Sequence, residues 1–403
     1  MNHLNPILVL GLLIFIGHFF TAIFKKTNIP DVLPLILIGI LIGSPLIGLV
    51  DLETVQGIGT VLGTIALALI LFEGGSHLQF DTLIRSLKDC LKLSTITFFM
   101  TTFVATFFLN IWFDLTLSMF AGIVLGSISP AVVVPIAKLL DITPETKTTL
   151  VVESAITDVL SIVFALSVIN SLKMGTTDLK DIFFNQLLVA LLMSFIFGFL
   201  GALIWSIILK KIRRFPNTIF TTLGFIFILY GLVEIFHYNG ALTILVFGLV
   251  IANSKKIPMD ILEFTNIEKT LFSEIIFIVK TFFFVYLGIC LSNQFGQTQI
   301  LLMGFILTLI LYLGRYILTR LLGPKDITKR ETNLIAFMIP KGLAAAVLVQ
   351  LLVDSNEIQE LEIFTSEELI SMRAVVYSVI FFSILISTIL IYIEESKREN
   401  HIV

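Results

Sequence analysis

Charged residues are scarce in this 403-residue chain, since Asp, Glu, Lys and Arg make up only 14% of it, whereas a soluble domain carries roughly a quarter. Hydrophobic residues reach 57%, and phenylalanine alone occurs 37 times. So few charges cannot cover a water-facing surface, and we therefore expect most of the surface to face lipid. The net charge of −3 also lacks the basic excess that favours a nucleic-acid partner.

Cysteine and histidine are equally sparse. The two cysteines, Cys90 and Cys290, lie far apart in apolar segments and define no disulfide framework, and the 5 histidines show no ligand spacing. No glycine-rich phosphate loop or nucleophile motif occurs. These absences predict a chain that is not an enzyme and that has no cofactor or resident metal. No Lys or Arg precedes Lys25, so we expect residues 5–24 to be a true membrane span rather than a cleaved signal peptide.

Runs of about 20 apolar residues are typical of membrane-spanning helices. They predict an all-α polytopic membrane protein with thirteen transmembrane helices. The expected spans lie near 5–24, 31–50, 56–75, 91–112, 116–139, 148–170, 184–209, 217–236, 238–253, 271–292, 299–322, 331–353 and 371–393.

Basic residues fall in alternate connections between these spans. If the N-terminus is outside, the inner connections hold every Lys and Arg that lies outside a span except Lys173, Lys180 and Arg373. The outer loop 354–369 contains acidic residues and no basic ones. This bias predicts a multi-pass protein of the cell membrane with its N-terminus outside and its C-terminus in the cytoplasm.

Thirteen spans divide into two six-helix halves of opposite orientation and one linking helix, a common transporter plan with its site on broken helices at the midplane. Corresponding spans of the two halves carry helix breakers: Gly126-Ser127-Ile128-Ser129-Pro130 in the first, and Pro340-Lys341-Gly342 in the second. Proline removes a backbone donor, and unwound backbone at this depth is tolerated where it lines a cavity or the protein interior. The pattern therefore predicts inverted repeats with crossed discontinuous helices; simple kinks are the alternative.

Span 148–170 contains the most informative acidic residue. Asp158 lies roughly 16 Å beyond the inner end of the helix, near the midplane, where a carboxylate is costly and by default functional. Ser154 precedes it by four residues, as Glu153 precedes Thr157, so two carboxylates and two hydroxyls lie on neighbouring faces. Oxygen ligands of this kind suit Na⁺, Li⁺ or K⁺.

Burial disfavours a lone charged carboxylate, whereas a bound proton neutralises it and a bound cation compensates it. The two occupants therefore exclude each other at Asp158, which predicts exchange of a monovalent cation for H⁺ if the site opens to one side at a time. A structural Asp paired with a buried basic residue is the alternative.

Four further charged residues have open roles. Glu153 and Arg315 lie at matching depths and are expected to form a salt bridge, or else Glu153 itself binds the ion. Lys280 could pair with Asp158, or snorkel, or stabilise a carbonyl end. Lys341 could offset the negative ends of half-helices or belong to a proton path. Glu73, at the inner end of its span, is either a solvated helix cap or part of a cytoplasmic funnel that leads to the site.

Several motifs together resemble the monovalent cation/proton antiporters of the sodium/proton exchanger superfamily, most closely the prokaryotic electroneutral branch. The resemblance runs over the whole chain. The motifs are Leu71-Phe72-Glu73-Gly74-Gly75, Ser129-Pro130-Ala131-Val132-Val133, Glu153-Ser154 with Thr157-Asp158, Phe283-Phe284-Val285-Tyr286-Leu287-Gly288, Gly314-Arg315 and Pro340-Lys341-Gly342-Leu343.

The resemblance implies that Asp158 carries the ion and the proton, with Thr157, Ser154, Ser129 and the backbone near Ile128 as neighbours. It also implies a homodimer in which transport helices (91–170 and 299–393) move like an elevator against scaffold helices (1–90 and 171–298), followed by a short cytoplasmic tail (394–403). This chain departs from the family pattern at Thr157, where relatives carry Asn or Asp, and at Ser129, where Asp is common.

Other classes of membrane protein fit less well. A cation-coupled solute symporter on a related inverted-repeat fold is the main alternative, but few intramembrane polar residues are present to line a solute cavity. An intramembrane aspartyl protease would need a second deep aspartate, and Asp158 has no such companion. A channel would need a continuous ring of polar residues.

Overall fold

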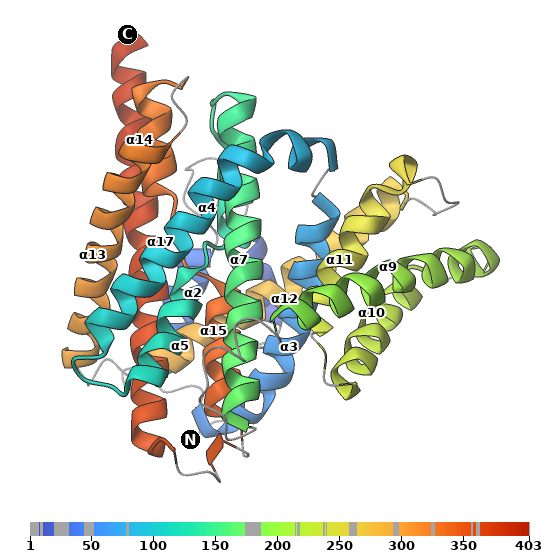
Figure 1. The fold of residues 1–403 in the computed structure, drawn as a ribbon, viewed down its shortest axis with the longest axis horizontal. Coiled ribbons are helices and arrows are strands. Elements are labelled where there is room, and N and C mark those ends of the chain that lie inside the picture. The colour runs from blue at the N-terminus through green and yellow to red at the C-terminus, as the bar shows by residue number, and fades with distance from the viewer. Residues whose placement is uncertain are drawn as a thin grey trace. The chain divides into compact units, whose positions relative to one another are not determined.

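The computed structural model describes residues 8, 11–19, 32–43, 52–77, 80–173, 187–213, 215, 218–236, 238, 240–257, 264–292, 298–323, 327–355, 358–359 and 363–402. The principal elements of this part of the chain are helices (Figure 1). They are α2 (Val32–Gly43), α3 (Leu52–His77), α4 (Phe80–Leu109), α5 (Leu115–Gly126), α6 (Pro130–Leu139), α7 (Pro144–Lys173), α9 (Leu187–Ile212), α10 (Thr218–Ile235), α11 (Gly240–Ala252), the 3₁₀ turn η2 (Ser254–Lys256), α12 (Asn266–Ser292), α13 (Thr298–Leu322), α14 (Lys329–Phe337), α15 (Leu343–Val353) and α17 (Ser366–Ile402).

The chain forms two compact units. Unit 1 consists of Met1–Leu62, Lys88–Ser161 and Lys280–Val403, and unit 2 of Gly63–Leu87 and Ile162–Val279. The helices of the expected transport ranges that lie wholly in unit 1 are α5, α6, α13, α14, α15 and α17. However, α2 and the second half of α12, which the sequence assigned to the scaffold, also lie in unit 1. The functional division into scaffold and transport helices stays a prediction.

Six helices are long and apolar enough to cross a membrane, and six shorter apolar helices accompany them in the described residues. The predicted span 5–24 is described only in part, as helix at 11–19, and residues 44–50 of the second span lie outside the description. The number thirteen therefore stays a prediction. The predicted tail from residue 394 continues α17 as helix to Ile402.

Unit 1 owes its close packing to α17 and to small residues. Helix α17 contacts α13, α14 and α15 and also reaches α2 and α5. At Gly39 of α2 and Gly288 of α12, a Cβ on either residue would overlap the backbone of the other helix. Gly122 of α5 faces the backbone of α4 in the same way. Glycine at these positions lets helix axes approach closely.

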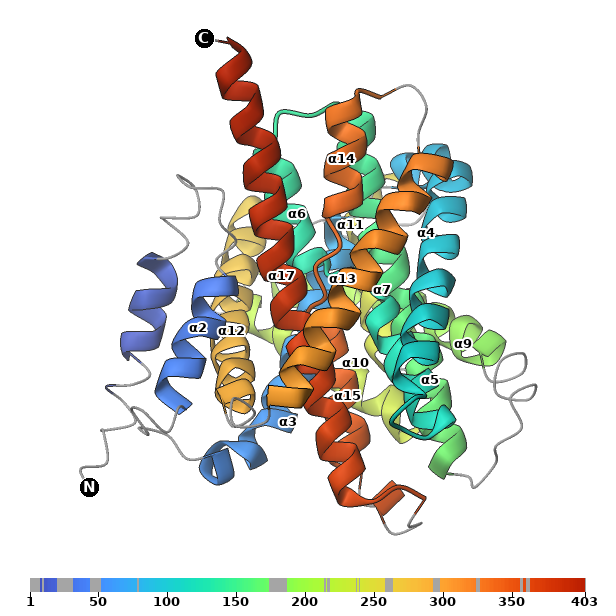
Figure 2. The ribbon, with the colours of Figure 1, turned by 90° about the vertical axis from the view of Figure 1, so that its left-hand side faces the viewer.

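Two helices of unit 1 are interrupted at the predicted places. Residues 127–129 separate α5 from α6, and residues 338–342 separate α14 from α15 as an extended segment that runs beside α17 (Figure 2). Pro130 occupies the first turn of α6, where its missing N–H costs nothing and its fixed φ favours helix. Proline here begins a helix rather than kinking one.

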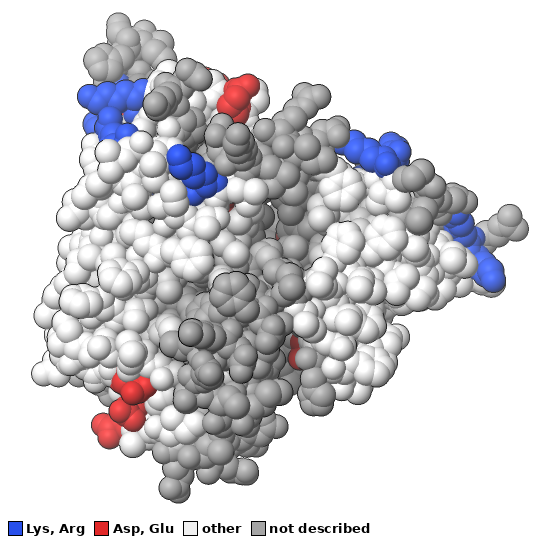
Figure 3. Space-filling model, viewed as in Figure 1, with Lys and Arg blue, Asp and Glu red and all other residues white. Residues whose placement is uncertain are grey.

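Unit 2 is built around α9, α10 and α11, which contact one another. Phe72 of α3 packs with Phe247 of α11 and with Phe264 and Phe272. Figure 3 shows broad uncharged surfaces between the charged side chains. Basic side chains gather toward the end of α17, and acidic side chains lie both at that end and at the opposite one. An uncharged band between charged ends is what a lipid-facing surface requires.

Candidate functional site

Helix α7 carries the central residues of the candidate site. It begins at Pro144 with Glu145 in its first turn, and both residues favour a helix N-terminus. Two turns further on, Glu153, Ser154, Thr157 and Asp158 are all buried, with at most 4% of their surface exposed. The helix thus places two carboxylates five residues apart inside unit 1.

Asp158 is a buried carboxylate that has no partner in the described part of the chain. It is 4% exposed, and within the described residues no hydrogen bond or ion pair reaches its side chain. A buried charged group without compensation is costly. The site therefore demands a ligand that neutralises the carboxylate, and a proton or a cation would do so.

The first helix break lies against this part of α7. The backbone N–H of Ile128 donates to the Thr157 hydroxyl at 3.1 Å, and that hydroxyl donates in turn to the Glu153 carbonyl oxygen at 2.9 Å. Ser161 donates to the carbonyl oxygen of Val124, near the end of α5, at 3.3 Å. The residue beside Asp158 therefore fixes the unwound segment instead of contributing a second charge.

The two breaks contact each other directly. The N–H of Ser129 donates to the carbonyl oxygen of Pro340 at 2.8 Å, and a Cβ on Gly342 would overlap the Ser129 side chain. Lys341, only 2% exposed, donates from Nζ to the Ser127 carbonyl oxygen at 2.9 Å. This amine lies at the negative C-terminal end of α5, where a cation is favourable. Which of its two open roles Lys341 has stays a prediction.

Serines of helix α17 form hydrogen bonds with the backbone of the second break. The Lys341 N–H donates to the Ser383 hydroxyl at 2.9 Å, and the Ser387 hydroxyl donates to the Phe337 carbonyl oxygen at 3.0 Å. Tyr312 of α13 bonds the Ser383 carbonyl oxygen at 2.8 Å. Polar backbone exposed by unwinding must be paired when buried, and these serines pair it.

Glu153 contrasts with Asp158. Both of its oxygens accept from Arg315 at 2.6 Å, and the two side chains are 2% and 1% exposed. Arg315 also donates to the Thr97 hydroxyl at 2.6 Å and to the Ile335 carbonyl oxygen at 3.3 Å. This bidentate bridge joins α7, α13, α4 and α14, and it leaves Glu153 poorly placed to bind a transported ion.

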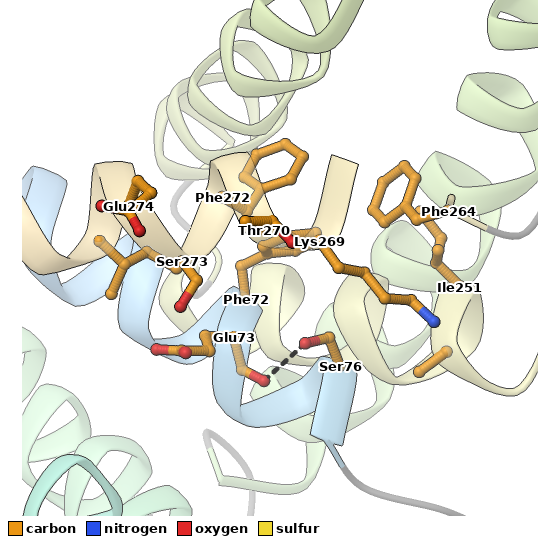
Figure 4. Close-up of a pocket in the computed structure, with 12 residues that line it drawn as sticks. Phe72, Glu73, Ser76, Ile251, Phe264, Lys269, Thr270, Phe272, Ser273 and Glu274 are labelled. Atoms are coloured by element: carbon orange, nitrogen blue, oxygen red, sulfur yellow. Dashed lines mark hydrogen bonds between the residues drawn. The ribbon is translucent and has the colours of Figure 1, made fainter. Parts of the chain in front are cut away.

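Two of the predicted modulators lie elsewhere. Lys280 of α12 is half-buried, and its role stays a prediction. Glu73 lies one turn before the end of α3, half-buried, rather than at the helix end where the sequence placed it. With Glu274, Lys269 and Ser76 it lines a pocket of unit 2 of about 560 Å³ (Figure 4). Its carboxylate faces the side of the pocket occupied by Ser273, while Lys269 extends to the other side.

The sequence interpretation missed five residues that bond to the breaks or to the charged residues beside them: Thr97, Ser161, Tyr312, Ser383 and Ser387. A signal exists for some of them, because Ser161 follows Thr157 by one helical turn and Ser387 follows Ser383 by one turn. Serine is nevertheless common inside membrane helices, and the sequence alone does not tell which hydroxyls face an unwound backbone.

Comparisons with known proteins agree on one family. The family model for the transmembrane part of the sodium/hydrogen exchangers matches residues 11–393. A probable Na⁺/H⁺ antiporter 2 of Methanocaldococcus jannaschii is 25% identical over 264 residues, covering 62% of this chain and 61% of the relative. Na⁺/H⁺ antiporter 1 of the same organism is 32% identical over 158 residues, covering 38% of this chain and 37% of the relative. Both alignments span less than two thirds of the relative's length.

The fold has a solved counterpart. The structure of the sodium proton antiporter MjNhaP1 from Methanocaldococcus jannaschii at pH 8 superposes with a TM-score of 0.77 at 23% identity, over 95% of this chain and 98% of that one. At this identity the likeness establishes the fold. Together with the family match over nearly the whole chain, it gives one conclusion: the chain belongs to the sodium/hydrogen exchanger family.

Proposed function

We propose that this chain is a secondary active antiporter that exchanges a monovalent cation for H⁺ across the membrane, and that the two ions compete for Asp158. The observation that carries the proposal is a buried carboxylate, 4% exposed and unpaired among the described residues, in a helix that contacts the first of two touching helix breaks. Exchange of this kind needs no cofactor, because the ions themselves are the substrates.

The ligands proposed for the cation are oxygens around Asp158. Ser154 donates its proton to the Val151 carbonyl at 2.9 Å, so its hydroxyl oxygen keeps lone pairs for a cation. The Ile128 carbonyl oxygen accepts no hydrogen bond from the residues described. Thr157 and Ser129 complete the proposed set. Oxygen ligands favour hard cations, and the names of the two relatives favour Na⁺ among them.

The proposed transport cycle is alternating access of the elevator type. Helices within 91–170 and 299–393 would carry Asp158 past the scaffold helices 1–90 and 171–298, in a homodimer embedded in lipid. The N-terminus would lie outside and the C-terminus inside; the basic side chains near the end of α17 support this orientation (Figure 3). One titrating carboxylate at the site favours electroneutral 1:1 exchange.

The test is cation-driven proton movement in proteoliposomes, followed by dequenching of an internal pH dye after Na⁺, Li⁺ or K⁺ is added separately, with and without a clamped voltage. Asp158→Asn should abolish the signal for every ion while the protein still elutes as a folded species. Asp114→Asn is the matched control, because Asp114 caps α5 through the Thr116 N–H at 2.7 Å and asparagine caps as well. Unchanged exchange by Asp158→Asn would reject the site.

A further inference from the structure

A second buried polar group lies in unit 1, and the site described above does not use it. It joins the second half of α12, the end of α15 and the first turns of α17. We call it the outer cluster, and its members are Tyr286, Cys290, Gln350, Asp354, Arg373 and Tyr377. All but the half-buried Asp354 are at most 6% exposed.

Gln350 is the hub of the outer cluster. Its Oε1 accepts from the Arg373 guanidinium at 3.2 Å and from the Tyr377 hydroxyl at 2.9 Å, and its Nε2 donates to the Asp354 carboxylate at 2.8 Å. One neutral amide therefore connects a buried positive charge to a negative one. Removing it would leave a guanidinium and a phenol without their acceptor.

The remaining two members come from α12. Tyr286 and Cys290 lie close enough to Arg373 and Asp354 to interact with them electrostatically. No hydrogen bond that joins them to Gln350 is formed in the described structure. The α12 side chains thus lie near the charged members of the cluster but are not hydrogen-bonded to Gln350.

The position of the outer cluster relates it to the ion site. Gln350 follows Gly342 by eight residues of helix, which is roughly 12 Å along α15. Helix α15 contacts α5, and in the predicted topology both are the outer halves of the broken spans. The outer cluster therefore lies between the breaks that flank Asp158 and the outer end of the helices.

A purely apolar contact would close the space between Asp158 and the outer end of the helices at a lower cost in free energy. A buried charged network is often less stable than hydrophobic packing of the same volume. Ionisable groups retained inside a membrane protein are functional by default. These groups bond one another when the region is dry and bond water when it is hydrated, so a polar contact of this kind makes both states accessible. That property suits a seal that opens and closes.

We propose that the outer cluster is the outer seal of the ion path to Asp158 and that Gln350 holds it closed. The inference rests on the proposed antiport function and extends it by naming the residues that close one side of the path. Cys290, 5% exposed, lies inside this seal and is a native reporter of its opening.

The experiment uses the full chain with Cys90→Ser, which makes Cys290 the sole thiol. A membrane-impermeant maleimide is added outside right-side-out membrane vesicles, and the rate of Cys290 modification is measured. Gln350→Leu should raise that rate roughly tenfold, because buried donors that lose their acceptor destabilise the closed state. Tyr377→Phe removes one hydrogen bond and keeps the ring, so it should raise the rate roughly threefold.

Thr319→Val is the matched control, since Thr319 of α13 is 1% exposed and its hydroxyl has no partner in the described residues. Modification at the control rate in both cluster variants would overturn the seal, as would an equal rise in the control. If Gln350→Leu fails to fold, Tyr377→Phe alone decides between these outcomes.

Asp158→Asn in the same background separates the two proposals. If Gln350→Leu does not change the rate of Cys290 labelling while Asp158→Asn still abolishes exchange, the seal is rejected and the antiporter is kept. If Gln350→Leu raises the rate of Cys290 labelling while Asp158→Asn leaves exchange unaffected, the ion site is rejected and the seal is kept.

Discussion

Two carboxylates of α7 lie five residues apart, equally buried and differently held. Both carboxylate oxygens of Glu153 accept hydrogen bonds from Arg315, whereas Asp158 has no partner in the described structure. A buried ion pair leaves neither charge available, while an unpaired carboxylate must take a proton or a cation. Partner geometry therefore separates a salt-bridged acid from the acid that we propose to carry the ions, within a single helix.

The largest expected effect on stability comes from removing Glu153, the paired carboxylate. Glu153→Ala leaves Arg315 buried and uncompensated, and we expect a loss of about 3–5 kcal/mol in unfolding free energy. Thermal unfolding of the purified protein in detergent measures it. Glu145→Ala, in the first turn of the same helix, is the control and should cost a few tenths of a kcal/mol. Adding Arg315→Leu to Glu153→Ala should recover part of the loss; strictly additive losses would contradict the pair.

A smaller effect is expected where α7 supports the first break. Thr157→Val keeps the shape of the side chain but leaves the Ile128 N–H without its acceptor, which should cost about 1–3 kcal/mol and slow exchange. Thr157→Ser retains the hydroxyl and should remain close to the native protein in both assays. If valine behaves like serine, the hydroxyl does not fix the break.

Smaller again is the effect at the second break. Ser383→Ala removes the acceptor of the Lys341 N–H and should lower the unfolding free energy by about 1 kcal/mol. Thr388→Val is a suitable control, because the Thr388 hydroxyl bonds only within its own helix, to Ile384. Equal unfolding midpoints for the two variants would show that α17 does not support the unwound segment.

The smallest expected effect on stability comes from substituting Asp158, the unpaired carboxylate. Asp158→Asn should leave the thermal midpoint unchanged or raise it, since a neutral amide is easier to bury than an unpaired carboxylate, although the same change should abolish exchange. A clear fall in the midpoint would mean that Asp158 has a structural partner, and the contrast with Glu153 would fail.

The sequence predicted much of this arrangement because each prediction rested on a local cost. Pro130 and Gly342 mark helix ends by their own backbone chemistry. Asp158 is conspicuous because a carboxylate inside a long apolar run needs a reason to be there. Glu153 and Arg315 could be matched by depth alone, as each needs an opposite charge.

The support of the breaks was not predictable in the same way. Ser383 and Ser387 resemble other hydroxyls of membrane helices until the fold brings α17 beside the extended segment 338–342. The bond from Lys341 to the Ser127 carbonyl oxygen was likewise not contained in the order of the residues. The sequence also placed Glu73 at a helix end, although α3 continues to His77.

The sequence by itself determined the class of protein, the positions of the breaks and the identity of the deep carboxylate, since all three follow from hydrophobicity and backbone chemistry along the chain. Only the tertiary structure decided between the pairings that the sequence left open: Arg315 reaches Glu153 across 162 residues, and Asp158 has no partner among the described residues. The physical reason is that pairing depends on side-chain distances of a few ångströms between helices, and residue order does not contain those distances.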